Sequence, residues 1–212
     1  MKIVLISSIP GVEVEDCAKN LIAHAAAAAV PAAEKVFKAE DELVRVATPF
    51  LKRARLPEPF SLAHVLSLPF EELCQSCHKA FDITLDKIGR ATRSRPPKFV
   101  FMTFHPVLFH QKTTEFVQPY QSALMREAFS IRKLDLKVIT SIHDDIYEIY
   151  RRLLQSGRLF DPILTREPIV IKSGENPVKS RNPIQDLEEL RLALDWRDRE
   201  LSTARTLARA MA

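Results

Sequence analysis

Histidine and acidic side chains follow two short apolar segments of this sequence, in positions that suit metal binding or proton transfer. His105 follows residues 99–104, and the run HDD at 143–145 comes shortly after residues 137–140. If both segments are parallel strands of one sheet, their carboxyl ends meet at one edge and the polar residues become neighbours. Imidazole and carboxylate groups serve both as metal ligands and as acid–base catalysts. The predicted metal ligands are His105, His143, Asp144 and Asp145.

The same residues also have ordinary structural explanations. Asp144 and Asp145 suit the first turn of a helix, where the helix dipole favours carboxylates. A histidine that follows a strand often only satisfies a backbone group. The functional interpretation therefore rests on topology, because polar clusters at the strand ends of open α/β sheets mark binding sites.

The segment IPGVEVED at residues 9–16 has two interpretations. Pro10 and Gly11 predict a turn, and Glu13, Glu15 and Asp16 place three carboxylates where a helix is expected to begin. Carboxylates are stabilising at a helix N-terminus, so an ordinary strand, turn and capped helix explains the segment. Alternatively, the segment is a phosphate-binding loop that has lost its phosphate chemistry, with a carboxylate in the anion position.

The segment CQSCH matches the C-x-x-C-H pattern of c-type haem attachment. It falls inside an amphipathic helix, where Cys77 lies on the apolar face and acts as a small hydrophobic residue. We see no signal peptide, which also argues against haem attachment. A zinc site formed by Cys74, Cys77 and His78 would need a further ligand at a recognisable spacing, which the sequence does not supply.

These residues need elements that position them, and the pattern of apolar residues predicts strands that alternate with helices. The predicted strands cover residues 3–6, 34–40, 99–104 and 137–140. The predicted helices cover residues 14–29, 41–52, 69–93, 119–129, 144–157 and 183–211. This alternation indicates an α/β fold with a parallel sheet of about four strands flanked by helices, as a single domain over residues 1–212.

Composition narrows the class of protein. The chain has 212 residues, of which 46% are hydrophobic and 27% are charged, as in globular proteins. A net charge of +4 is too small and too dispersed to indicate nucleic acid as a partner. The sequence has no apolar run near the ~20 residues of a membrane helix. Three cysteines argue against a disulfide framework, so we expect a cytoplasmic protein.

The order of the segments resembles archaeal-type adenylate kinases and related P-loop nucleotide kinases. KIVLISSIPGV resembles their first strand and phosphate loop, whose pattern is G-x-P-G-x-G-K-[ST]. VITSIHDDIYEIYRRLLQSGR resembles the fourth strand and the helix before the lid, and LDWRDRELSTARTLA resembles the arginine-bearing helix after it. The resemblance implies a three-layer P-loop NTPase-like fold, with a lid-like basic arm at residues 158–182 and a final helix at 183–211.

The phosphate loop departs from the family pattern. Ser8 and Glu13 stand at two of its glycines, Val14 at its lysine and Glu15 at its hydroxyl residue. One like-charge contact near 4 Å costs about 1 kcal/mol in water and about 4 kcal/mol at a protein-like dielectric constant. Several such contacts would exceed the binding free energy of a millimolar ligand, which is about 4 kcal/mol. We therefore interpret the loop as a degenerate Walker A loop.

The resemblance also assigns roles to basic residues near the lid, since family members hold phosphates with arginines there. An exposed basic surface is the alternative explanation for these arginines. The residues expected to contact a nucleotide are Pro10, Gly11, Glu13, Glu15, Arg151, Arg152, Arg158 and Arg166.

Two functions remain open. The first is a non-catalytic accessory or regulatory subunit that binds another protein subunit or a second copy of itself, with nucleotide binding weak or lost. The alternative is a nucleotide-processing enzyme, a kinase-like phosphotransferase or NTPase, that uses the lid arginines and a metal at the strand ends. No cofactor is firmly implied, and ATP with Mg²⁺ belongs to the alternative. The degenerate loop favours the first function.

The strand predicted at residues 137–140 is expected to lie at the sheet edge. Family members add a fifth strand beside this one, and no apolar β-branched run is left here to form it. Bare edges template pairing with other chains. The final helix, the basic arm or a partner chain is therefore expected to cover the surface around Val138 and Ile139.

Overall fold

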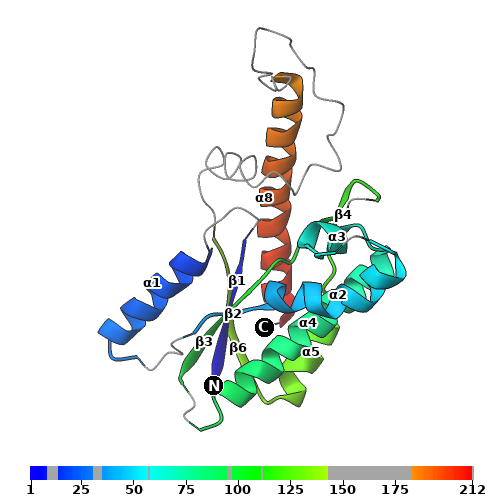
Figure 1. Cartoon of the computed structure of the whole chain (residues 1–212). Coiled ribbons are helices and arrows are strands. Elements are labelled where there is room, and N and C mark those ends of the chain that lie inside the picture. The colour runs from blue at the N-terminus through cyan, green and yellow to red at the C-terminus, as the bar shows by residue number, and fades with distance from the viewer. Residues whose placement is uncertain are drawn as a thin grey trace, which may run out of the picture.

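A parallel four-stranded sheet forms the centre of the computed structural model of the chain (Figure 1). Its strands are β1 (Lys2–Ser7), β2 (Phe37–Lys38), β3 (Phe99–Phe104) and β6 (Asp135–Ser141). The order across the sheet is β2-β3-β1-β6, so β1 lies between β3 and β6. Ile3 pairs with Val100 on one side and with Leu136 on the other. The parallel α/β sheet predicted from the sequence is confirmed.

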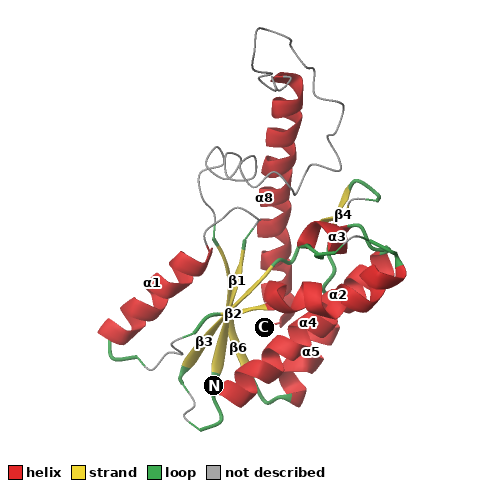
Figure 2. Cartoon of the chain, viewed as in Figure 1, coloured by secondary structure: helices red, strands yellow, loops and turns green. Residues whose placement is uncertain are grey.

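The structure describes residues 1–8, 14–30, 35–56, 58–94, 97–110, 112–142 and 183–211, without the side chains of residues 15, 63 and 183–189. Figure 2 shows helices on both sides of the sheet. The described helices are α1 (Val14–Ala27), α2 (Ala39–Arg53), α3 (Leu62–Leu66), α4 (Phe70–Ala91), α5 (Ser122–Ile131) and α8 (Pro183–Met211). None of these described helices combines the length and the apolar character that a lipid bilayer requires of a spanning helix.

Alternate side chains of β1 face two different apolar layers, as expected for a strand buried on both faces. Ile3 and Leu5 join the larger core, which α2, α4, α5 and the end of α8 also enter. Val4 and Ile6 pack in a smaller cluster with Ala18 of α1 on the opposite face. The sheet therefore lies between α1 on one side and the remaining long helices on the other, a three-layer arrangement (Figure 1).

Helix α4 supplies much of the larger core. Leu73, Cys77, Phe81, Leu85 and Ile88 recur every three or four residues and are all buried, so one face of the helix is continuous and apolar. Burying one large side chain of this kind contributes about 1.5–3 kcal/mol to folding. The predicted helix at residues 69–93 and the place of Cys77 on its apolar face are confirmed.

Helix α8 runs alongside the sheet and continues beyond the carboxyl ends of the strands (Figure 1). Ala193, Trp196, Glu200, Ala204 and Leu207 are buried and recur every three or four residues, which gives the helix one inward face. Trp196 is 1% exposed and is a packing anchor of this face.

Two parts of the fold differ from the prediction. The strand expected at residues 34–40 is short, since only Phe37 and Lys38 pair with β3 and α2 already begins at Ala39. Between β3 and α5, two strands that were not predicted form an antiparallel hairpin, β4 (Leu108–His110) and β5 (Glu115–Val117). Three-residue strands have too few residues to show an alternating pattern, so no periodicity predicts them.

Strand β6 occupies the edge of the described sheet, as predicted for residues 137–140. It pairs with β1 through a register shift at Lys137, which is a β-bulge. Helix α8 packs beside it, and Leu136, Val138, Ala208 and Met211 line a groove between the two elements. Val138 is 46% exposed. A bulge and a lysine are two devices that protect sheet edges from pairing, so this edge is partly guarded.

Candidate functional site

Polar side chains from four elements converge at the carboxyl ends of β1 and β3. Ser7 and Ser8 end β1, Glu40 opens α2, His105 follows β3 and Glu200 comes from α8. We call these five residues the strand-end cluster. Parallel strands bring such residues together because their carboxyl ends share one edge, the usual ligand position in α/β sheets. His105 was predicted to lie there, and the structure places it there.

Both ring nitrogens of His105 have partners. Nδ1 lies at hydrogen-bond distance from the carbonyl oxygen of Ser8, and because a carbonyl only accepts, the imidazole donates. Nε2 lies 3.5 Å from Oε1 of Glu40. The other carboxylate oxygen of Glu40 accepts a 3.0 Å hydrogen bond from the hydroxyl of Thr103. The imidazole therefore links the end of β1 to the start of α2.

Glu200 reaches the same edge from the C-terminal helix and is 0% exposed. Its Oε2 accepts a 3.3 Å hydrogen bond from the backbone N–H of Val107. Its Oε1 has no hydrogen-bond partner among the described residues. A buried, half-satisfied carboxyl is unusual, because an unpaired polar atom in the interior carries a desolvation cost.

Burial raises the pKa of the Glu200 carboxyl well above its ordinary value, because the protein interior disfavours the charged form. The Glu40 carboxylate raises it further. The N–H of Val107, the hydroxyl of Ser7 and the N–H of Ser8 counteract part of this rise by favouring the ionised form. The balance favours a protonated carboxyl that can donate as well as accept.

Trp196 fixes this part of α8 against the hairpin. Its indole Nε1 donates a 3.0 Å hydrogen bond to the carbonyl oxygen of Val107, the same residue whose N–H binds Glu200. Its ring packs against Phe116 of β5 at a centroid distance of 5.6 Å. Trp196 and Glu200, one helical turn apart, thus bond the carbonyl oxygen and the N–H of Val107, respectively. These two hydrogen bonds set the position of Glu200 over the strand ends.

The side chains at the end of β6 complete this edge. The hydroxyls of Ser7 and Ser141 lie 2.6 Å apart, and the N–H of Ile142 donates to the carbonyl oxygen of Ser7 at 2.9 Å. Ser7 is fully buried. Carboxyls, hydroxyls and one imidazole make up this group of described residues, and none of them carries a fixed positive charge.

Of the four predicted metal ligands, only His105 lies among the described residues. His105 and Glu40 are close enough to share a cation, but the described residues contain no group of three or more side chains suited to hold a metal ion. His143, Asp144 and Asp145 lie outside the described residues. His110, which follows the same strand, does not join the cluster: it is buried in β4 and bonds the carbonyl oxygen of Leu68 at 2.7 Å.

The residues expected to contact a nucleotide fall mostly outside the described part of the chain. Glu15 lies in the first turn of α1, and its side chain is not described. Those outside the described residues are Pro10, Gly11, Glu13, Arg151, Arg152, Arg158 and Arg166.

The CQSCH segment is explained by packing. Cys77 is fully buried, and burial raises the pKa of its thiol far above the ordinary value, which leaves it a poor nucleophile. His78 accepts a 3.3 Å hydrogen bond from the backbone N–H of Gln121, just before α5. Its ring meets that of Tyr120 edge-on at 5.7 Å. Haem attachment would require Cys77 and His78 to leave these positions.

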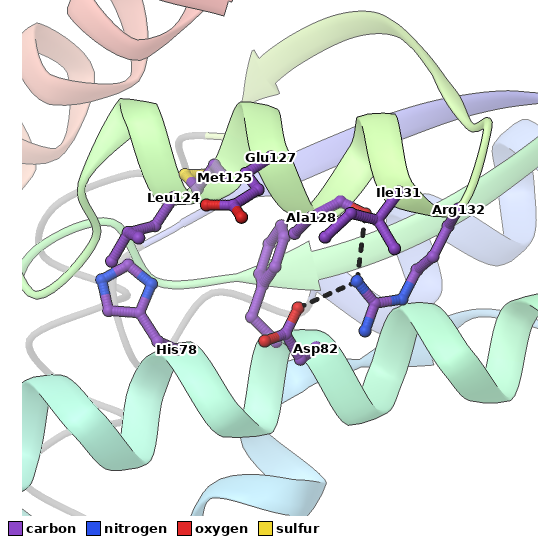
Figure 3. Close-up of a pocket in the computed structure, with 9 residues that line it drawn as sticks. His78, Asp82, Leu124, Met125, Glu127, Ala128, Ile131 and Arg132 are labelled. Atoms are coloured by element: carbon purple, nitrogen blue, oxygen red, sulfur yellow. Dashed lines mark hydrogen bonds and ion pairs between the residues drawn. The ribbon is translucent and has the colours of Figure 1, made fainter.

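A second feature, unrelated to the strand ends, is an open groove between α4 and α5 (Figure 3). Its volume is about 300 Å³. We call it the α4–α5 groove. Phe81, Met125 and Ala128 are buried and form its floor, while Leu124 and Ile131 of α5 form its apolar walls. These two wall residues are 42% and 69% exposed, respectively.

Polar groups close the two ends of the α4–α5 groove. His78 lies at the end near the start of α5, and Arg132 lies at the other (Figure 3). Arg132 binds Asp86 through Nε at 2.7 Å and Asp82 through a terminal nitrogen at 3.1 Å. These two ion pairs join α5 to α4, and Arg132 also donates to the carbonyl oxygen of Ala128, within α5, at 3.0 Å. One feature of the sequence could have indicated this groove: two large apolar residues, Leu124 and Ile131, lie seven positions apart on a helix.

Comparison with known proteins adds no family assignment. Neither a scan against protein-family models nor a search of curated proteins found a match to this chain. The function is therefore argued from the strand-end cluster and the α4–α5 groove themselves.

Proposed function

We propose that this chain is a non-catalytic, adenylate-kinase-like P-loop protein that acts as an accessory or regulatory subunit by binding other proteins. Nucleotide binding is weak or lost in this proposal. One observation carries it: the carboxyl of Glu200 occupies the strand-end position where an α/β sheet of this type would hold an anionic ligand.

Backbone N–H groups at strand ends and helix N-termini are the usual donors to a bound phosphate. Here the N–H of Val107 binds Glu200, and the N–H of Ser8 and the hydroxyl of Ser7 also act on that carboxyl. An incoming phosphate would compete with a group that is covalently part of the chain and already in place. It would also meet Glu40 across the cluster.

The charges of the strand-end cluster also argue against nucleotide binding. Glu40 contributes a carboxylate, the buried carboxyl of Glu200 supplies no positive charge, and the five residues of the strand-end cluster include no lysine or arginine. A like charge near 4 Å costs about 4 kcal/mol at an effective dielectric constant of about 20, as large as the whole free energy of millimolar binding.

Support for protein binding comes from the surface. Leu124 and Ile131 are large, exposed and apolar, and they flank a hollow rather than being scattered singly. Apolar side chains that gather around a depression are typical of interaction sites. The molecule thus combines a strand-end position occupied by its own side chain with an apolar surface open to a partner.

Isothermal titration calorimetry with ATP–Mg²⁺ and with AMP tests the loss of nucleotide binding. We expect dissociation constants weaker than about 1 mM, equivalent to less than about 4 kcal/mol. Micromolar binding that is abolished by changes at Glu13 and Glu15 would overturn the proposal and restore a working loop. A coupled phosphotransferase assay on the same protein is expected to show no turnover.

The nucleotide-processing alternative predicts a different result. In that case binding survives changes in the loop but disappears in the double variant Arg151→Gln/Arg158→Gln. The matched control is Lys52→Gln/Arg53→Gln, because both side chains lie on α2, where they pair with Glu58 and Glu72. Nucleotide binding lost only in the first double variant would favour the enzyme.

A further inference from the structure

The α4–α5 groove has the shape to receive side chains from a helix. Leu124 and Ile131 are seven residues apart, so they lie on one face of α5 about 10.5 Å from each other. A second helix lying along the groove would present side chains at the same repeat, since residues at i, i+3 or i+4 and i+7 share a face. A helix lying along α5 can therefore place its side chains in step with both walls, whereas the alternate side chains of an extended chain, about 6.6 Å apart, do not share this repeat.

The size of the groove argues against a small-molecule site. Its volume of about 300 Å³ lies at the lower limit of ligand pockets. Ligand pockets usually enclose most of their ligand, whereas both walls here remain substantially exposed. A hollow of this size accommodates one or two large apolar side chains while the rest of the partner stays on the surface.

The groove is acidic as well as apolar. Asp82, Asp86 and Glu127 bring three carboxylates to the groove or its end, against the single guanidinium of Arg132. Burial lowers the pKa of His78, which disfavours a positive charge on this side chain. Asp82 and Asp86 are each 47% exposed, which leaves part of each carboxylate available to a partner.

We propose that the α4–α5 groove binds a basic amphipathic helix of a partner protein, with apolar residues at i, i+3 or i+4 and i+7 and lysine or arginine beside them. The apolar residues pack between Leu124 and Ile131 over Phe81. The basic residues approach Glu127, Asp82 and Asp86. This inference rests on the proposed function and names the class of partner and the surface it uses.

The test is a binding selection with the full-length chain and a displayed library of 18-residue amphipathic helices. All members share leucines at i, i+4 and i+7, and their polar positions are randomised among Lys, Arg, Glu, Gln and Ser. We expect enrichment of positively charged members. Fluorescence anisotropy of the most enriched peptide is expected to show a dissociation constant that weakens at least tenfold in Leu124→Ser/Ile131→Ser.

Matched variants isolate the groove from general surface effects. Leu21 of α1 is 43% exposed, nearly the same as Leu124, so Leu21→Ser is the apolar control and is expected to leave binding unchanged. Glu127→Gln is expected to weaken binding several-fold and to flatten its dependence on salt. Circular dichroism verifies that each variant is folded.

Three outcomes would overturn the proposal: no enrichment, enrichment without positive charge, or equal binding by Leu124→Ser/Ile131→Ser and the parent chain. These outcomes leave the calorimetry with ATP–Mg²⁺ untouched, so failure here is distinguishable from failure of the proposed function. Conversely, micromolar ATP binding would remove the proposed function without affecting the selection.

Discussion

The strand-end cluster buries its polar groups, whereas the α4–α5 groove exposes apolar side chains. In the strand-end cluster, the polar groups are turned inward and bind one another, so that Glu200, a side chain of the protein itself, takes the ligand position. In the groove, polar groups stand at the ends and two large apolar side chains remain in solvent. The position that the sheet topology marks as a ligand site is occupied from within, and the open surface lies elsewhere.

The difference also concerns what holds each region together. The strand-end cluster depends on α8, whose contacts reach residues about ninety positions earlier in the chain. The groove is formed by α4 and α5, which are joined by Arg132, the hydrogen bond from Gln121 to His78 and shared packing around Phe81. Changes in the two regions should therefore have separable effects.

The largest effect is expected from Trp196→Ala. The substitution removes a fully buried ring and its hydrogen bond to Val107, which should lower the free energy of unfolding by about 3–5 kcal/mol. Chemical denaturation measures the change. Arg197→Ala, one position along and partly exposed, is the control and is expected to cost less than about 1 kcal/mol. A loss below 1 kcal/mol for Trp196→Ala would mean that α8 does not seal the strand ends.

A pH-dependent effect is expected from Glu200→Gln. The folded-state pKa of Glu200 is raised, so the folded chain holds this proton more tightly than the unfolded chain does. The stability it contributes is complete below the ordinary pKa of about 4.5 and falls as pH rises through the folded pKa, by up to about 1.4 kcal/mol per pH unit. Glu200→Gln should therefore be more stable than the parent at pH 8, with the advantage vanishing toward pH 4.5.

Urea denaturation of both chains between pH 4.5 and pH 9 checks this difference. The parent and the variant share every other ionisable group, including Glu40 beside Glu200, so the comparison between them cancels much of the contribution of those groups. Glu127→Gln provides the control from the groove, where the carboxylate is exposed. A difference between Glu200→Gln and the parent that grows toward low pH would contradict the expected sign.

The smallest effect is expected from Arg132→Gln in the groove. Its two carboxylate partners are each about half exposed, so solvent screens the ion pairs and the loss should be about 1 kcal/mol. The loss should shrink in 0.5 M salt, which screens such pairs. Lys52→Gln, which removes an ion pair to Glu58 with both partners above 60% exposed, is the control and should be close to neutral. A salt-independent loss of 3 kcal/mol would show that Arg132 acts through packing.

The sequence predicted the sheet well where strands are continuous and apolar. The run at residues 99–104 matches β3 in full, because a strand buried on both faces leaves a local signal. The prediction was less accurate for β2, which contains only Phe37 and Lys38 because α2 begins at Ala39. Tertiary packing, rather than the local residue pattern, determines where this strand ends.

The site was predictable in part. The place of His105 follows from position alone, since it comes directly after β3, whereas Glu40 lies in the first turn of α2, two residues beyond β2. The role of Glu200 depends on a contact with Val107, which no local pattern encodes. The sequence nonetheless contains an indication of this role. Glu200 lies four residues after Trp196, on the apolar helix face that continues to Ala204 and Leu207, where a buried carboxyl is unusual.

The contact between Glu200 and Val107 spans 93 residues, and that between Trp196 and Val107 spans 89. A chain emerges from the ribosome at about 5–20 residues per second, so Val107 waits roughly 5–20 seconds for its partners on α8. During that interval β1 and β3 are already available to pair, while the carboxyl that later fills their ends has not yet been synthesised. The nascent chain therefore passes through a stage in which the strand-end donors face solvent, and the order of synthesis makes docking of α8 a late step in its maturation.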